Sequence, residues 1–292
     1  MTTVTDIVSS HREAGTFFEA GGVRSFVRDE GSGEPIVLVH GLPASSFLFR
    51  KVIACLARSG YRGIAFDLPG LGLADRPADF DYSLAGLGAF AEAAADALGL
   101  ERFHLVVHDA GGPVGFDLVA RDPDRIRSLT VTNTVVELSG TRFPGEVLAR
   151  GVRRVPGWLA SEAVWRFMMD RVGVLDRSEV SDAELDAYRT LALGSDHGAG
   201  YLRIMRGLGE QRSTPIDYQP VLDATRVPYP VQVVWGADDP ILRLRSFGWK
   251  ALAATGLESL HALPARHFLH EDQAGAVAEL VVALAQRVDG GD

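Results

Sequence analysis

The feature that most constrains the fold of this chain is a regular alternation of short apolar runs with longer helical patterns. Each run is rich in apolar residues and is bounded by Gly, Pro or Asp, which is typical of strands buried on both faces of a parallel sheet. Strands and helices that alternate in this way indicate an α/β fold, with helices on both faces of a mostly parallel sheet. The predicted strands are Ile36–His40, Gly63–Asp67, His104–His108, Leu129–Asn133, Val231–Trp235 and Leu257–Ala262.

Several of the other segments have recognisable local patterns. Ser46–Ser59 and Ser83–Leu98 carry apolar residues at mixed spacings of three and four, which predicts helices with one apolar face. Asp272–Val288 is also predicted to be helical, and it opens on an aspartate that could cap the helix. Near the N-terminus, Phe17–Ala20 and Val23–Arg28 flank a Gly-Gly pair, which predicts an antiparallel hairpin at one edge of the sheet.

The segment 138–219 interrupts this alternation. It is rich in aromatic residues and methionine in helical surroundings, and it contains no convincing strand pattern. We interpret it as a helical cap inserted after the sixth sheet strand. The chain is then divided into a first core part (1–137), the cap (138–219) and a second core part (220–292). Met and aromatic side chains at helical spacing are more often core than ligand contacts, but in a cap that lies over a site some can be both.

Composition narrows the classes of function. The chain has 292 residues and a formal net charge of −9, and this acidic balance disfavours nucleic acid, which binds clustered Lys and Arg. Cys55 is the one cysteine, so no internal disulfide can form and a reducing compartment is indicated. The chain has no apolar run of about 18 residues and no apolar signal-peptide core near its N-terminus. We therefore expect a cytoplasmic protein with no membrane segment and no nucleic-acid partner.

The strongest chemical signal is Asp109, which directly follows a predicted buried strand and precedes two glycines and a helical pattern. A turn from strand through nucleophile to helix is tight, so the residue two positions after the nucleophile must be small, as Gly111 is. Such a turn lifts the nucleophile above the sheet, where the helix N-terminus favours a carboxylate. The alternative is that Asp109 only caps the following helix.

A second predicted strand leads into the motif His-Gly-Leu-Pro at residues 40–43. Gly41 permits a sharp turn, after which the backbone N–H of Leu42 can face the site. Together with the backbone N–H of Ala110, it would form a two-donor hole for developing negative charge. The alternative is an ordinary turn from strand to loop.

Two more polar side chains follow the last two predicted strands. Asp239 lies three residues after Gly236, and His267 lies in the loop after the final strand. Asp109, Asp239 and His267 thus follow the nucleophile–acid–histidine order of α/β-hydrolases.

Nearby residues offer alternatives for some of these roles. Glu137, after the sixth strand, could supply the acid, but the spacing of Asp239 from Gly236 fits better. Asp238 is interpreted as a turn residue. His108 and His270 flank the site in the sequence and are interpreted as structural histidines.

With these residues in order, the sequence resembles the haloalkane dehalogenase and epoxide hydrolase branch of the α/β-hydrolase fold over nearly its whole length. The resemblance implies that Asp109 forms a covalent ester with the substrate. His267, oriented by Asp239, would then activate water to hydrolyse that ester. This chemistry needs no metal or organic cofactor, and no metal-ligand spacing is evident. The matching motifs are HGLPASSF (40–47), FDLPGLG (66–72), VHDAGG (107–112), WGADDP (235–240) and His267 with Glu271-Asp272.

The sequence departs from this family where the leaving group binds. Haloalkane dehalogenases usually carry a tryptophan directly after the nucleophile and an Asn or Glu in the His-Gly-x-Pro loop, and here these positions are Ala110 and Leu42. Epoxide hydrolases accept an apolar residue in that loop and usually place two cap tyrosines to protonate the epoxide oxygen. Tyr201 is one candidate for this role. Tyr188 also has a family-like position, and the alternative for it is a structural role.

Three hypotheses for the function follow. The first is a hydrolase that opens an epoxide or a similar strained, electrophilic ring through Asp109. The second is a haloalkane or haloacid dehalogenase with halide donors supplied by the cap, such as Trp165, Tyr188 or Arg203. The third is a non-hydrolytic biosynthetic or binding protein, which is disfavoured because a binding pocket does not need the base His267. In both enzyme hypotheses the partners are a small apolar electrophile and water, and the oligomeric state is left open.

Overall fold

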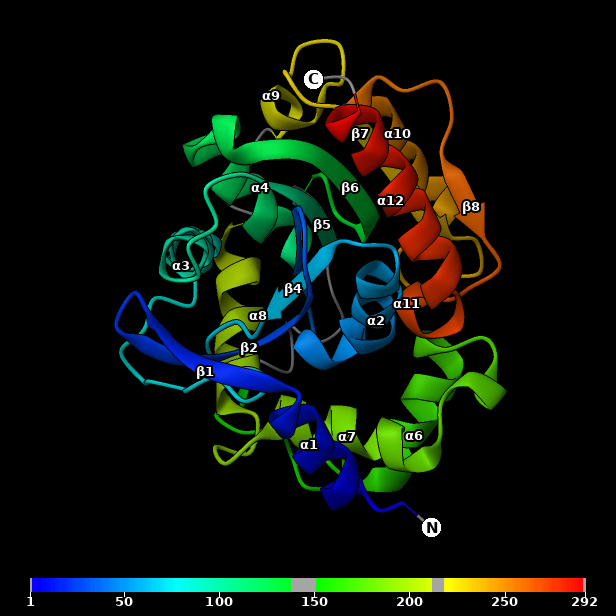
Figure 1. The fold of residues 1–292 in the computed structure, drawn as a ribbon. Helices are drawn as coiled ribbons and strands as arrows, with labels where there is room; N and C mark the ends of the chain where they lie inside the picture. The colour runs from blue at the N-terminus through cyan, green and yellow to red at the C-terminus, as the bar shows by residue number, and fades with distance from the viewer. Residues whose placement is uncertain (1, 138–150, 212–217, 291–292) are drawn as a thin grey trace.

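A computed structural model describes residues 2–137, 151–211 and 218–290 (Figure 1). Its centre is an eight-stranded sheet. The strands are β1 (Gly15–Ala20), β2 (Val23–Gly31), β3 (Pro35–Val39), β4 (Arg62–Phe66), β5 (Phe103–Asp109), β6 (Ile126–Thr134), β7 (Val231–Gly236) and β8 (His261–Leu263). They lie in the order β1-β2-β4-β3-β5-β6-β7-β8. β2 pairs antiparallel with both β1 and β4, whereas the other pairs are parallel. The sheet is therefore mostly parallel, as predicted.

Helices cover both faces of the sheet, which confirms the predicted α/β class. The helices outside the insertion are α1 (Val4–Glu13), α2 (Arg50–Arg58), α3 (Leu84–Ala97), α4 (Gly111–Arg121), α9 (Gln219–Leu222), α10 (Trp249–Thr255), α11 (Leu269–Asp272) and α12 (Ala274–Asp289). α2 packs against α12, and α3 packs against α4. Successive residues of β3 alternate between two apolar cores, with Ile36 and Leu38 in the core of α2 and α12, and Val37 and Val39 in that of α3 and α4. Among the described residues, no helix is long and apolar enough to cross a membrane.

Two predicted elements are confirmed closely. β1 and β2 form an antiparallel hairpin at the edge of the sheet. Its turn is made by Gly21 and Gly22, which have φ of 54° and 75°, a conformation that glycine adopts without a steric penalty. α3 begins where the sequence predicted, because the Ser83 side chain accepts the backbone N–H of Gly86 and caps the helix.

Three predicted elements differ in detail. The final strand is shorter than Leu257–Ala262 and begins at His261, because an edge strand needs neither length nor two apolar faces. The predicted helix Ser46–Ser59 starts with a 3₁₀ turn before α2. Asp272 does not cap α12, which begins at Ala274. Its carboxylate instead accepts the backbone N–H groups of Leu175 and Asp176, each at 2.9 Å.

A helical insertion lies between β6 and β7. Its described part, residues 151–211, contains α6 (Glu162–Met168), a π-helical turn (Met169–Gly173), α7 (Asp182–Leu193) and α8 (Ala199–Gln211), and no strand. Trp165 and Tyr188 are buried, whereas Trp158 and Phe167 are exposed, so the aromatic residues do not all belong to a core. We propose 138–219 as the limits of this cap, and parts of both ends lie outside the described residues.

Candidate active site

Asp109 lies at the turn between β5 and α4. Its φ is 52°, in the left-handed region that few residues other than glycine adopt. A Cβ on Gly111 would lie 2.2 Å from the carbonyl oxygen of Val39, and a Cβ on Gly112 would lie 1.9 Å from Thr134 Oγ1. Only glycine fits at these two positions, as predicted for Gly111. Thr134 Oγ1 also donates a hydrogen bond to the carbonyl of Asp109, which ties the turn to β6.

The loop after β3 brings a backbone donor to Asp109. Gly41 comes so close that a Cβ there would lie 2.3 Å from Asp109 Oδ1 and 2.4 Å from the nitrogen of Ala110. The backbone N–H of Leu42 donates a 2.7 Å hydrogen bond to Asp109 Oδ1. Ala110 is the N-cap of α4, so the carboxylate also lies at the positive end of this helix. The structure thus brings Leu42, Asp109 and Ala110 together, and the side chains of Leu42 and Ala110 are apolar.

His267 lies between two carboxylates. Its Nδ1 is 2.8 Å from Asp239 Oδ2, and its Nε2 is 3.5 Å from Asp109 Oδ2. Asp239 Oδ1 accepts the backbone N–H groups of Ile241 and Leu242 at 2.8 and 2.9 Å. His267 and Asp239 are both buried, so water competes little for the contact between them. This arrangement can hold the imidazole in one orientation and move a proton at its Nε2.

The protonation states of the three groups follow from burial and from their charges. Burial acts to lower the pKa of His267, but Asp239 and Asp109 together outweigh it and raise this pKa to about 10. Burial acts to raise the pKa of Asp239, but His267 and hydrogen-bond donors hold it at about 2. The pKa of Asp109 also lies below its usual range, because His267 and the Leu42 N–H outweigh its burial. At neutral pH the site therefore holds an imidazolium between two carboxylates.

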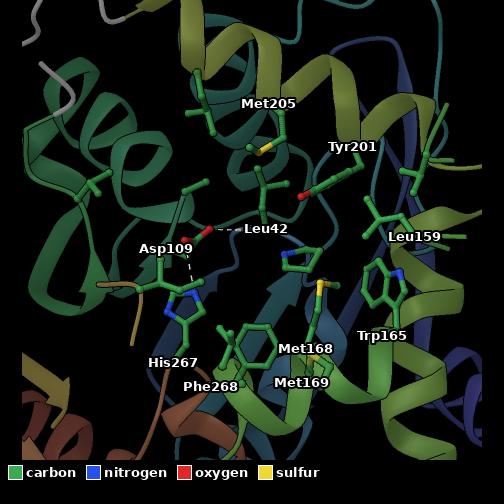
Figure 2. Close-up of a pocket in the computed structure, with 18 residues that line it drawn as sticks. Leu42, Asp109, Leu159, Trp165, Met168, Met169, Tyr201, Met205, His267 and Phe268 are labelled. Atoms are coloured by element: carbon green, nitrogen blue, oxygen red, sulfur yellow. Dashed lines mark hydrogen bonds and ion pairs between the residues drawn. The ribbon is translucent and has the colours of Figure 1, made fainter. Parts of the chain in front are cut away.

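A pocket of about 400 Å³ lies over Asp109, and residues of the core and of the cap line it (Figure 2). Most of the lining is aliphatic, and it includes Met168, Met169 and Met205, which are all the methionines after Met1. An apolar pocket of this size can hold a small organic molecule. Among the described residues, no group of three or more His, Cys, Asp or Glu side chains is arranged to hold a metal ion.

Two of the predicted cap residues, Tyr201 and Trp165, line this pocket. Figure 2 shows the Tyr201 hydroxyl pointing into the pocket, toward Leu42 and Asp109. Burial and then the charge of Asp109 raise the pKa of Tyr201 to about 12, so the phenol is protonated at neutral pH. The Nε1 of Trp165 is buried and has no hydrogen-bond partner in the described part of the chain. In Figure 2 it lies on the edge of the indole turned away from Asp109.

The other two predicted cap donors lie outside the pocket. Tyr188 is 1% exposed, and its hydroxyl donates to Glu271, which is paired with Arg50. The guanidinium of Arg203 lies 5.6 Å from the centre of the Tyr82 ring. The prediction that Tyr188 and Arg203 contact a leaving group is therefore corrected, because other partners hold both side chains elsewhere.

The alternatives for the acid lie on the surface, and the two histidines that flank the site in the sequence are buried. Glu137 is half exposed and forms an ion pair with a lysine. Asp238 is exposed in the turn after β7. His108 and His270 are fully buried, and burial lowers the pKa of each. His108 Nε2 is 2.9 Å from the carbonyl oxygen of His267, which agrees with a structural role.

Asn133 belongs to this site and was not singled out in the sequence. It is the residue before the last of β6 and has φ of 28°, and its side chain is fully buried. Its Nδ2 donates a 2.6 Å hydrogen bond to Asp239 Oδ2, and its Oδ1 accepts the backbone N–H of Gly236 at 2.8 Å. Asn133 therefore fixes the carboxylate that contacts His267. The sequence did offer one signal for this residue. Asn133 is a polar residue near the C-terminal end of an apolar strand, and β6 lies between β5 and β7, which lead to Asp109 and Asp239.

Comparison with known proteins supports the fold. Residues 34–171 match a family model described as alpha/beta hydrolase fold. The chain is 27% identical over 275 residues to haloalkane dehalogenase 2 of Mycobacterium tuberculosis, a match that covers 91% of this chain and 93% of that protein. It is 28% identical over 289 residues to a haloalkane dehalogenase of Agrobacterium fabrum, covering 93% and 91% of the two chains.

Two further matches broaden this comparison. Over 121 residues the chain is 40% identical to the cis-3-alkyl-4-alkyloxetan-2-one decarboxylase of Shewanella oneidensis, covering 40% of this chain and 38% of that protein. An epoxide hydrolase from Vigna radiata superposes with a TM-score of 0.74 at 18% identity, covering 94% of this chain and 97% of that chain. The chain is thus an enzyme with the α/β-hydrolase fold and a helical insertion, related in sequence to haloalkane dehalogenases and in fold to epoxide hydrolases.

Proposed function

We propose that this enzyme opens an epoxide or a similarly strained oxygen ring by attack of Asp109, and then hydrolyses the ester that forms. The Tyr201 hydroxyl carries this proposal, because it points into an apolar pocket toward Asp109 and stays protonated. An opening ring produces an alkoxide that needs a proton, which a phenol in this position can donate. A departing halide instead needs persistent donors, and the side chains of Leu42 and Ala110 offer none.

In the first step, Asp109 Oδ2 is the attacking atom, because Oδ1 is held by the Leu42 N–H. The new bond joins Oδ2 to a ring carbon, and the bond between that carbon and the ring oxygen breaks. The ring oxygen keeps the electron pair and takes the proton of the Tyr201 hydroxyl. The product of this step is a neutral ester of Asp109 that carries a hydroxyl group.

Ester formation prepares His267 for the second step. It removes one of the two negative charges that raise the pKa of His267, so this pKa falls. The imidazolium can then give up its proton, which restores the Tyr201 hydroxyl from the phenolate left by the first step. Neutral His267 then takes a proton from water at Nε2, while Asp239 stabilises the imidazolium that results. The water oxygen attacks the carbonyl carbon of the ester, and Oδ1 carries the developing negative charge beside the Leu42 N–H. The bond between that carbon and Oδ2 then breaks, and Oδ2 leaves with the diol after taking a proton from His267. The water oxygen stays in the carboxyl group of Asp109, whose proton returns to His267.

Dehalogenation is the second candidate, because the two relatives described above, which match over most of their length, are haloalkane dehalogenases. The same two steps would apply, with the Tyr201 hydroxyl as the side-chain donor to the halide. A strained oxygen ring has separate support in the name of the shorter match, since an oxetan-2-one is a four-membered oxygen ring. In either case the partners are a small, uncharged, apolar electrophile and water.

Two probes with one carbon skeleton, 1,2-epoxyhexane and 1-bromohexane, distinguish these candidates. We expect diol formation from the epoxide to exceed bromide release from the alkyl halide. Tyr201→Phe should slow epoxide opening by about 100-fold, whereas the control Tyr188→Phe should change it less than about twofold, because Tyr188 lies outside the pocket. Bromide release that is faster than epoxide opening would make dehalogenation the better proposal.

A further inference from the structure

We infer that Arg76 positions Tyr201 for the reaction, acting through Asp196 and the turn that begins α8. This inference rests on the proposed role of Tyr201 as the proton donor. Arg76 belongs to the core loop after β4, and its side chain is only 7% exposed. It lies far from Tyr201 in the sequence, and its contacts in the structure connect the two.

The guanidinium of Arg76 joins the core to the cap by hydrogen bonds on two sides. On the core side it donates to the carbonyl groups of Gly70 and Gly72, at 2.5 and 3.1 Å. On the cap side it donates to the carbonyl groups of Leu191 and Ala192, at 2.8 and 3.3 Å. These two carbonyls lie in the last turn of α7, which directly precedes the turn into α8.

Asp196 contacts both Arg76 and the backbone next to Tyr201. Its Oδ1 lies 3.4 Å from Arg76 Nη1 and accepts the backbone N–H of Gly198 at 3.1 Å. Its Oδ2 accepts the backbone N–H of Gly200 at 2.6 Å, one residue before Tyr201. Asp196 thus orders the first turn of α8, and Arg76 fixes Asp196 relative to the core.

Close backbone packing makes this connection sensitive to position. A Cβ on Gly200 would lie 2.7 Å from the Cα of Gly70, and a Cβ on Gly194 would lie 2.3 Å from Cζ of Arg76. The start of α8 therefore rests on the core loop with no side chain between them. A shift of this contact would move Tyr201 relative to Asp109.

The same core loop is tied to the loop that carries Leu42. Asp67, which begins it, is fully buried, and it accepts the backbone N–H groups of Ser46 and Leu73, both at 2.7 Å. The stretch 67–76 thus contacts both the loop after β3, whose Leu42 N–H binds Asp109, and the helix α8, which carries Tyr201. Misplacement of a reacting group by about 1 Å can cost roughly 100-fold in rate, so this connection bears directly on ring opening.

A change in the surroundings of Tyr201 can be measured by ¹⁹F NMR without any substrate. In protein labelled with 3-fluorotyrosine, the ¹⁹F resonance of Tyr201 is the one that Tyr201→Phe removes. We expect Arg76→Met to move this resonance, and Arg76→Lys to restore it only in part, because lysine cannot reach all the acceptors at once. Asp196→Asn, which loses the ion pair but keeps an oxygen acceptor, should move it too and serves if Arg76→Met does not fold. A Tyr201 resonance that stays in place in these variants would overturn the inference.

Arg125→Met is the matched control for this measurement. Arg125 has a similarly buried side chain, 13% exposed, and donates to Asp96 Oδ1 and to the carbonyl of Leu100. It directly precedes β6, at the N-terminal end of that strand, whereas Asp109 is the last residue of β5, at the C-terminal end. Its loss should leave the Tyr201 resonance in place.

Kinetics separate positioning from a merely structural role. Ester formation with 1,2-epoxyhexane is measured in single turnovers, with and without Tyr201→Phe. Arg76→Met should slow this step about tenfold to 100-fold when Tyr201 is present, but less than about twofold in the Tyr201→Phe background, with ester hydrolysis unchanged. Equal slowing in both backgrounds would contradict the inference. If Tyr201→Phe alone has no effect, the proposed donor is wrong, and the ¹⁹F resonance still decides whether Arg76 positions Tyr201.

Discussion

Asp109 combines a positive φ with a carboxylate in a poorly solvated position. Asp, Asn and Gly adopt the left-handed region at the lowest cost, because a short polar side chain can form local hydrogen bonds there. The Leu42 N–H and His267 compensate for the lost hydration and lower the pKa of the carboxyl group. The backbone geometry and the proposed chemistry thus favour the same residue.

Asp109→Asn separates the requirement of the backbone for a residue that tolerates positive φ from the requirement of the reaction for a carboxylate. Asparagine tolerates the same φ, so we expect the protein to stay folded, with a melting temperature within a few degrees of wild type. The amide is not a nucleophile, so turnover should fall by about four orders of magnitude. Circular dichroism and initial rates check the two halves of this prediction. Near wild-type turnover, with the substitution verified by mass, would exclude Asp109 as the attacking group.

His267→Gln should allow the first step and block the second. Attack by Asp109 needs no base, whereas hydrolysis of the ester does, so the protein should gain the mass of the epoxide on the peptide that contains Asp109. Loss of the imidazolium also removes a charge that lowers the pKa of Asp109. The acid limb of ester formation should therefore move to higher pH than in wild type. Intact-protein mass spectrometry and single-turnover rates between pH 3 and 7 test both expectations, with Asp109→Asn as the unlabelled control.

At the scale of elements, one contact between the cap and the core joins α7 to α11. Glu271 on α11 is fully buried and pairs with Arg50 and Lys51, and it accepts the hydroxyl of Tyr188 on α7. Arg50 pairs in turn with Glu184 on α7. Buried charges are tolerated only when they are paired and hydrogen-bonded, so this cluster strongly constrains how α7 lies on the core.

Substitutions in this cluster should affect stability and spare catalysis. Glu271→Ala removes the main partner of Arg50 and should lower the free energy of unfolding by about 3 kcal/mol. Tyr188→Phe removes one hydrogen bond and should lower it by about 1 kcal/mol. Urea unfolding gives both values. A kcat for Tyr188→Phe that falls as far as that of Tyr201→Phe would mean that Tyr188 contacts the substrate after all.

For the whole molecule, the charges of the site make stability depend on pH. The pKa of His267 rises from 6.5 to about 10 on folding, so its contribution is complete below pH 6.5 and is lost as the pH rises through 10. The pKa of Asp239 falls from 3.8 to about 2, so its contribution is complete above pH 3.8 and is lost as the pH falls through 2. Both contributions to stability are therefore complete only between pH 3.8 and pH 6.5.

Thermal unfolding across this range tests the linkage. The melting temperature of wild type should fall between pH 7 and pH 10, and the fall should be smaller in His267→Gln, which lacks the imidazolium. Arg and Lys stay charged in both proteins over most of this range, so the difference between the two curves isolates His267. Parallel curves would show that the pKa of His267 is not raised on folding.

Sequence alone determined the α/β class, the hairpin at the sheet edge and the order of Asp109, Asp239 and His267. Strands buried on both faces must be apolar along their whole length, so they stand out in the sequence. Parallel strands end at one edge of the sheet, so polar residues at their C-terminal ends can be expected to meet. The need for a small residue at position 111 could be predicted, because a tight turn leaves no room for a side chain there.

Only the tertiary structure determined which other residues lie in the site with Asp109, Asp239 and His267. Tyr188 and Tyr201 lie on different cap helices, and only the packing of α7 and α8 on the core determines that Tyr201 faces Asp109 while Tyr188 meets Glu271. Asn133 lies near the C-terminal end of β6, and its contact with Asp239 depends on the pairing of β6 with β7. Such contacts join segments far apart in the chain, so no local pattern encodes them and they form only when the cap and sheet pack together.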